Sequence, residues 1–371
     1  MSEFNNFNVN YEPEPPTEKG FTVGGEEYRP VTNEQNKFNQ VFKDYQTPVF
    51  DPEVFAEKQQ LKSDARLIGA SFLVLSGIIF LFNVVIVIAS MIITKTLDME
   101  AADLLWEPAV LQIQQILFAS LSFTLPFIII FKVAGIRISN LISFKKPEKK
   151  TVLPFLMFGV AFCSFANIAS SIAESILKNA NIDYEVTMPK NPTGFFGFAL
   201  SLISTVLVPA LVEEFACRGL MLGLLKKYGE GFAIVTSSLL FGLMHGNFEQ
   251  MPFAFLVGLV LGFITVKSGT IWIAIAVHGF NNLIAVLFDY VFSNFSSSAQ
   301  NIGYTIYLLT TLALGIFAIF LFHGKDENLY KFNSSNMKST EKQKLIWFFT
   351  SIPIIIYVVI CIIDSLQYFV I

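Results

Sequence analysis

Charged residues are scarce in this sequence, and the motifs of several protein classes are missing. Only 15% of the 371 residues are Asp, Glu, Lys or Arg, and the mean hydropathy is +0.58, which excludes an ordinary soluble domain of this length. The formal charge is -4, and no basic cluster with interleaved aromatic residues is present, which excludes a nucleic-acid-binding protein. The lack of a Gly-rich phosphate loop argues against an ATP-driven machine. The composition therefore predicts a membrane protein.

Cysteine is also scarce, with three residues that lie far apart in apolar segments: Cys163, Cys217 and Cys361. Their odd number and the lack of a CxxC pattern exclude a disulfide framework and a cysteine metal site. Cys217 is near two glutamates, which would disfavour the thiolate that a nucleophile needs. We therefore interpret all three as small buried apolar side chains.

Long apolar runs are abundant. The runs long enough to cross about 30 Å of hydrocarbon are approximately 66–95, 108–133, 152–177, 195–225, 231–247, 251–267, 270–292, 303–323 and 345–369. A backbone in lipid must satisfy its own hydrogen bonds, so each run is expected to be a helix. The sequence predicts an all-α, polytopic membrane helical bundle of about nine transmembrane helices over residues 66–371. The fifth and sixth runs are short and are separated only by residues 246–251.

Residues 1–65 differ from the rest, because they are rich in Asn, Glu, Pro and Gln and lack apolar periodicity until about Val49. This composition predicts a disordered tail that ends in a short helix near residues 51–64. The polar start is not typical of a signal peptide, so the first apolar run is expected to be a true span. Lys and Arg gather after the second, fourth, sixth and eighth runs. The positive-inside rule then predicts that these loops and the N-terminus are cytoplasmic in the cell membrane.

The segment LVEEFACRGLMLG (Leu211–Gly223) places Glu213, Glu214 and Arg218 within a predicted span. Each such group costs about 2.5 to 3.5 kcal/mol at the centre of a spanning helix. Glu214 and Arg218 are four residues apart and face the same way on a helix, so they are predicted to pair. Glu213 lies about 100° around the helix and remains free for another partner. An ion network that only holds helices together would not need this second carboxylate, which indicates acid or base chemistry.

Two of the three histidines, His245 and His278, also lie in predicted spans. Counted at 1.5 Å per residue from the cytoplasmic helix ends, Glu213 lies about 18 Å deep, His245 about 21 Å and His278 about 12 Å. Asn282 lies one turn after His278 on the same face. We therefore expect these titratable groups to meet at a similar level of the membrane.

Three short motifs carry a resemblance to a known family. The family has the motifs EExxxR, FxxxH and HxxxN, in this order along the chain. They correspond here to EEFACR (Glu213, Glu214, Arg218), FGLMH (Phe241, His245) and HGFNN (His278, Asn282). The chain resembles the CPBP intramembrane protease family, which includes the type II CAAX prenyl proteases and the bacterial Abi proteins linked to bacteriocin processing and self-immunity. The resemblance covers a catalytic core at about residues 150–295. It implies a helical membrane core whose cavity admits peptide and water.

Amide hydrolysis needs an activated water, a general base and donors that hold the oxyanion. Glu213 suits the base, and His245 can hold the same water. His278 and Asn282 can stabilise the oxyanion or orient the peptide, while Glu214 and Arg218 keep the helix in place. Zinc is an alternative, since Glu213 or Glu214 with His245 and His278 would form a familiar hydrolytic set. The sequence only slightly favours the metal-free form.

The predicted function is therefore intramembrane endopeptidase cleavage of a membrane-associated peptide or protein within the lipid bilayer. The substrate could be a CAAX-type C-terminus, a leader or bacteriocin peptide, or a membrane-anchored protein. A proton- or cation-coupled transporter would also use buried Glu and His, but the sequence shows no internal repeat. A non-catalytic immunity or scaffold protein that keeps the motifs for structure remains a third interpretation.

Overall fold

The computed structural model describes residues 21–23, 26–28, 51–97, 103–180, 182, 184, 191–292, 295–322 and 329–369. The chain divides into two compact units, Met1–Pro52 and Glu53–Ile371. In the first unit, strands β1 (Phe21–Val23) and β2 (Glu26–Tyr28) pair antiparallel, with Phe21 opposite Tyr28. The rest of the predicted disordered tail up to residue 50 lies outside the described residues.

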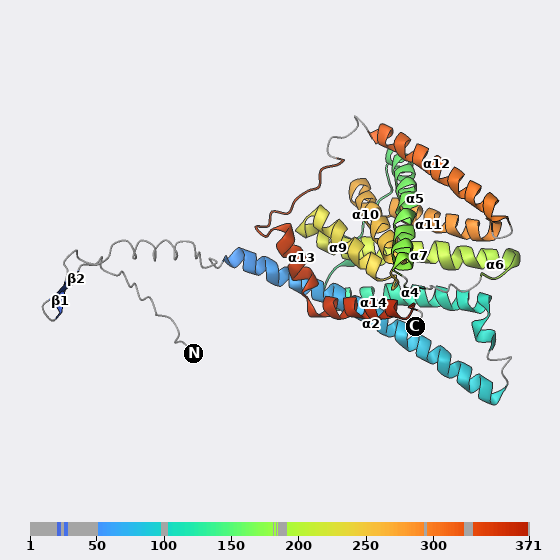
Figure 1. Ribbon diagram of the computed structural model, residues 1–371, viewed down its shortest axis with the longest axis horizontal. Coiled ribbons are helices and arrows are strands. Elements are labelled where there is room, and N and C mark those ends of the chain that lie inside the picture. The colour runs from blue at the N-terminus through green and yellow to red at the C-terminus, as the bar shows by residue number, and fades with distance from the viewer. Residues whose placement is uncertain are drawn as a thin grey trace. The chain divides into compact units, whose positions relative to one another are not determined.

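All the secondary structure that the described residues of the second unit form is helical, apart from one isolated bridge between Tyr184 and Phe369, which confirms the all-α fold class (Figure 1). Its first half contains α2 (Pro52–Thr96), η1 (Leu104–Trp106), α4 (Pro108–Val133), η2 (Ile138–Asn140) and α5 (Lys149–Asn179). A long central segment follows, made of α6 (Gly194–Ser201), η3 (Leu202–Leu207), α7 (Val208–Glu214), η4 (Phe215–Met221), α8 (Leu222–Leu225) and η5 (Lys226–Tyr228). The last part contains α9 (Glu230–Leu243), α10 (Gln250–Ser268), α11 (Trp272–Leu287), η6 (Phe288–Phe292), α12 (Ser297–Phe322), α13 (Glu341–Phe349) and α14 (Ile352–Leu366).

The number of membrane spans is lower than the sequence predicted. Among the described residues, seven helices are long and apolar enough to cross a membrane, and α13 with α14 makes an eighth if this pair is one span. The pair is bent by 72°, just before Pro353, a residue that cannot continue an upstream helix. The predicted fifth span is α9, whose 14 residues reach only about 21 Å. Apolar length alone does not reveal such breaks, so the prediction of nine was approximate.

The start of α2 also differs from the prediction. The short helix predicted near residues 51–64 at the end of the tail is not separate from the first span, because residues 52–65 form the first turns of a 45-residue helix that begins at Pro52. Leu61, Asp64 and Ala65 are buried in this part of the helix. Proline suits the first helical position because its missing N–H has no partner there in any case. The first span is therefore continuous with a helix packed against the rest of the second unit.

The basic loops lie together at one end of the bundle, which we call the basic end. Although α9 is short, α9 and α10 run side by side as a hairpin, so the chain returns to this end (Figure 1). Residues 323–328 of the last basic loop, including Lys325, lie outside the described residues. The contacts that define the basic end are Lys227 Nζ to Asp64 Oδ2 (2.7 Å), Lys267 Nζ to Glu230 Oε2 (3.2 Å), Thr270 Oγ1 to the Lys145 carbonyl (2.7 Å) and Lys344 Nζ to the Tyr228 carbonyl (2.8 Å).

Glycine allows α10 to lie close against α9. A Cβ added at Gly258 would be 2.9 Å from the Ser238 Cβ and 3.0 Å from its Cα, so the two helices would have to separate. Because the Gly258 carbonyl also accepts a hydrogen bond from Arg218 at 3.2 Å, this contact connects helix packing with the central segment.

Gly258→Ala is expected to destabilise the fold by about 1–3 kcal/mol, since overpacking forces backbone shifts. Gly77→Ala is the matched control, because a Cβ at Gly77 in α2 would meet no atom within 4 Å. Thermal unfolding of both purified variants in detergent measures the effect. Equal melting temperatures for the two variants would contradict this account of α9–α10 packing.

Candidate active site

The central segment carries two π-helical stretches, η3 and η4, on either side of α7. A π-helical turn inserts an extra residue, which changes the direction of side chains and frees carbonyls from the regular ladder. Such turns are frequent at functional sites. Glu213 and Glu214 end α7, and Arg218 lies inside η4. The charged residues thus occupy the most irregular part of this segment.

Glu214 is the centre of a buried network. Its Oε1 atom accepts hydrogen bonds from Arg218 Nη1 and His278 Nδ1, both at 2.9 Å. Arg218 Nη2 donates to the Gly258 carbonyl, and the guanidinium carbon lies 4.1 Å from the centre of the Phe241 ring. Glu214 is fully buried and Arg218 is 2% exposed. The pairing predicted from the four-residue spacing is therefore present, and His278 is an additional partner.

Glu213 lies in a different environment from its neighbour. Its side chain is 15% exposed, and Oε2 is 4.0 Å from His278 Nε2. His278 must donate its Nδ1 proton to the Glu214 carboxylate, since an ionised carboxylate only accepts. A separation of 4.0 Å is too long for a direct hydrogen bond between these two atoms. Glu214 is thus anchored by two partners, whereas Glu213 is partly exposed and lies beside the imidazole of His278.

His245 lies just after the end of α9. Its Nδ1 atom is 2.8 Å from the Phe241 carbonyl, which can only accept, so this nitrogen carries the proton and the neutral ring keeps its Nε2 lone pair free. The Phe241 ring packs edge-on against both imidazoles, with centroid distances of 5.1 Å to His245 and 5.9 Å to His278. Phe241 therefore brings the two histidines and Arg218 around one ring. The FxxxH motif was the sequence signal for this role.

Asn282 is held on the face of α11 that packs against η3. Its Nδ2 atom donates to the Thr205 carbonyl at 3.0 Å, and its Oδ1 atom accepts from Asn281 Nδ2 at 3.3 Å. One N–H of the Asn282 amide is left for another acceptor. Sequence reasoning missed Thr205 and Gly258, and no signal could have found them, because both contribute backbone carbonyls.

The candidate metal ligands do not form a preassembled site. Among the described residues, no group of three or more His, Cys, Asp and Glu side chains could hold a metal ion. Both imidazoles have a free Nε2, which suits metal binding, but a third donor does not converge with them. We therefore derive no step through zinc, which remains a hypothesis for a chelator experiment.

All three cysteines are buried and free, as the sequence predicted. Cys217 lies between Glu214 and Arg218 in sequence, but it is fully buried, unlike Glu213. A substrate could not reach its thiol without displacing the core, so Cys217 is not part of the candidate site.

The comparison with protein families gives one match. The family model described as "Type II CAAX prenyl endopeptidase Rce1-like" matches residues 195–284. This segment contains all six polar residues of the candidate site and confirms the predicted family resemblance, over a shorter range than 150–295. No curated protein and no solved structure matches the chain.

Proposed function

We propose, from the premise that residues 195–284 match the Rce1-like family of type II CAAX prenyl endopeptidases, that this multi-pass membrane protein hydrolyses a peptide bond with a water activated by Glu213. The observation that carries the proposal is the contrast between the adjacent glutamates. Glu214 is buried and binds Arg218 and His278, whereas Glu213 is partly exposed and 4.0 Å from His278 Nε2.

In the proposed reaction, a water molecule binds between Glu213 and the free Nε2 of His245. Glu213 takes a proton from this water as its oxygen attacks the carbonyl carbon of the scissile peptide bond. The carbon–nitrogen bond of the tetrahedral intermediate then breaks, and the proton passes from Glu213 to the leaving amine. The products are a new carboxylate and a new amine, so no external reactant besides water is needed.

The oxyanion needs donors placed before the reaction starts. We propose Asn282, which has one free amide N–H, as such a donor, with His278 orienting the peptide beside Glu213. The buried Glu214 and Arg218 do not touch substrate in this scheme. They are positioning residues, because they fix the ring of His278 and the backbone of the central segment.

We propose a prenylated peptide with a C-terminal CAAX sequence as the first substrate to test, because the matched family acts on such termini by its printed description. Leader peptides and membrane-anchored proteins are the other candidates. The assay uses the purified full-length protein in detergent, with prenylated, unprenylated and leader peptides, and mass spectrometry of the products. Cleavage of none of these peptides, together with proton-coupled uptake in proteoliposomes, would support the transporter interpretation instead.

The orientation proposed is that the basic end faces the cytoplasm. The positive-inside rule supports it, since the basic loops after α4, η5 and α10 share this end. Lys227 contacts Asp64 in the first turns of α2, so the start of α2 also lies at this end. Labelling of a cysteine introduced at exposed Lys146 by an impermeant reagent, in intact and opened cells, tests this orientation.

A metal chelator is expected to leave the cleavage rate unchanged within about twofold, because Glu213 and His245 provide the base and the water-binding group without a metal. The measurement is cleavage of the prenylated peptide after dialysis against a strong chelator. Loss of activity that returns on addition of zinc alone would reject the metal-free mechanism and favour zinc on Glu213 or Glu214 with the two histidines.

Asn282→Ala is expected to lower kcat by about 10²–10³-fold, the usual effect of losing one oxyanion donor, with a small change in KM. Asn281→Ala is the control, since within the described residues the side chain of Asn281 donates one hydrogen bond, to the Asn282 side chain. An equal loss for both variants would mean that Asn282 acts through local structure, and an unchanged kcat for Asn282→Ala would remove it from the site.

A further inference from the structure

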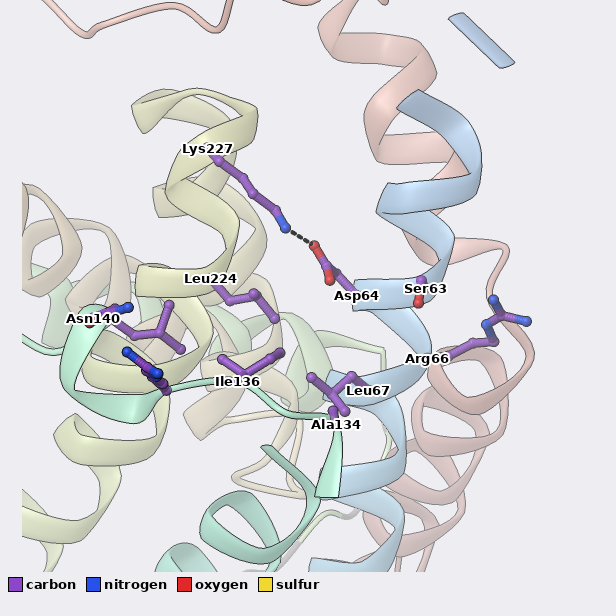
Figure 2. Close-up of a pocket in the computed structure, with 11 residues that line it drawn as sticks. Ser63, Asp64, Arg66, Leu67, Ala134, Ile136, Asn140, Leu224 and Lys227 are labelled. Carbon is purple, nitrogen blue, oxygen red and sulfur yellow. Dashed lines mark ion pairs between the residues drawn. The ribbon is translucent and has the colours of Figure 1, made fainter. Parts of the chain in front are cut away.

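A cavity of about 690 Å³ lies at the basic end, far along the central segment from Glu213. Its walls come from α2, from the turn that follows α4, and from the end of α8 with η5. Figure 2 shows Lys227 and Asp64 facing each other across the gap between the central segment and α2. The mechanism proposed above uses none of these residues, so the cavity requires its own explanation.

The lining of the cavity carries more positive than negative charge. Arg66, Arg137 and Lys227 line it, and Asp64 is the only acidic residue among the lining residues. Asp64 is already neutralised, because its Oδ2 atom accepts from the Tyr228 hydroxyl at 2.6 Å and from Lys227 Nζ at 2.7 Å. No ion pair of Arg66 or Arg137 is found within the described residues. The Arg66 side chain lies at the outer edge, directed away from Lys227 (Figure 2). This surplus of cationic groups favours an anion.

The rest of the lining is apolar. Leu67, Ala134, Ile136 and Leu224 form a floor between α2 and α8, while Asn140 adds an amide near the rim (Figure 2). A site for a free phosphate ion would not need an apolar floor. An amphiphile does, because its charged group binds the cations and its first methylenes cover the apolar side chains.

The position of the cavity along α2 favours a lipid as the amphiphile. Beyond Leu67, α2 exposes large apolar side chains, among them Val74, Phe80 and Leu81. Apolar residues on the outside of a membrane helix face acyl chains. This is the arrangement expected of a headgroup site, because the cavity adjoins the apolar outer surface of the same helix.

We propose that this cavity binds the phosphate headgroup of an anionic membrane lipid, with Arg137 as the main cationic contact. The lipid connects α2 to the end of the central segment, since its first methylenes cover Leu67 of α2 and Leu224 of α8. Binding is expected to raise the thermal stability of the protein, because a ligand that binds only the folded state stabilises it. This site is independent of the proposed protease activity.

The test is binding of phosphatidylglycerol to the delipidated full-length protein in a neutral detergent, followed by native mass spectrometry and thermal unfolding. Phosphatidylglycerol is expected to bind and raise the melting temperature, whereas phosphatidylcholine and inorganic phosphate are not. Arg137→Gln is expected to weaken binding about fivefold, the usual contribution of one basic residue near an anionic membrane surface. Lys146→Gln is the control, since Lys146 is exposed on the same loop and does not line the cavity.

Three results would overturn the proposal. Equal binding of phosphatidylglycerol and phosphatidylcholine would show that the negative charge of the lipid headgroup does not determine binding. Inorganic phosphate that binds as tightly as the lipid would assign the cavity to a soluble anion. Unchanged lipid binding in the double variant Arg137→Gln/Asn140→Ala, with Lys146→Gln as reference, would exclude this cavity as the site.

Discussion

Glu213→Gln is expected to lower the rate of peptide cleavage by about 10²–10⁴-fold, the range that general-base catalysis contributes. The amide has nearly the shape of the carboxylate but cannot take a proton from water. Because His278 Nε2 is 4.0 Å from the Glu213 carboxylate, too far for a hydrogen bond, and the Glu213 side chain is partly exposed, folding and membrane insertion should be preserved. The measurement is kcat for a prenylated CAAX peptide, with thermal unfolding of the same preparation.

Glu174→Gln provides the matched control for this substitution. This substitution makes the same chemical change at an exposed residue of α5, outside the candidate site. Full activity in Glu174→Gln and a large loss in Glu213→Gln, at equal melting temperatures, is the expected pattern. If Glu213→Gln cleaves at the wild-type rate, Glu213 is not the base and the proposed mechanism is wrong, even if the protein remains a protease.

Glu214→Leu is expected to destabilise the protein by about 3–5 kcal/mol, the usual result of removing one partner of a buried ion pair. Arg218 would keep only the Gly258 carbonyl and the Phe241 ring as partners, and His278 would lose the acceptor of its Nδ1 proton. The measurement is equilibrium unfolding in mixed detergent micelles, where the folded fraction is followed by helix content.

The adjacent glutamate gives the control for this prediction. Glu213→Leu makes the same change in charge and volume at the preceding residue. Because the Glu213 side chain is partly exposed, this variant should lose much less free energy of unfolding than Glu214→Leu. The double variant Glu214→Leu/Arg218→Met removes both charges and should recover most of the loss, because apolar replacement of a whole buried pair is often neutral. A Glu214→Leu variant as stable as Glu213→Leu would contradict the anchoring role of Glu214.

The sequence alone was sufficient for the features that depend on one helix. The length of the apolar runs predicted a helical membrane protein, because a helix must be about 20 residues long to cross the hydrocarbon core of a bilayer and a backbone in lipid must satisfy its own hydrogen bonds. The spacing of Glu214 and Arg218 predicted their pairing, since residues four apart share a helix face. The motif order pointed to the protease family that residues 195–284 match. These properties are local, because each depends only on residues that are close together in the sequence.

Only the tertiary structure decided which glutamate is anchored and which is open. His278 binds Glu214 from a position 64 residues away in the chain, and the Gly258 carbonyl that accepts from Arg218 is 40 residues away. The 72° bend between α13 and α14 was also not predicted, although Pro353 stands at the start of α14. The physical reason is that a buried side chain or backbone carbonyl acquires its hydrogen-bond partner only when distant segments of the chain pack together. Such long-range pairing leaves no periodic trace in the order of the residues.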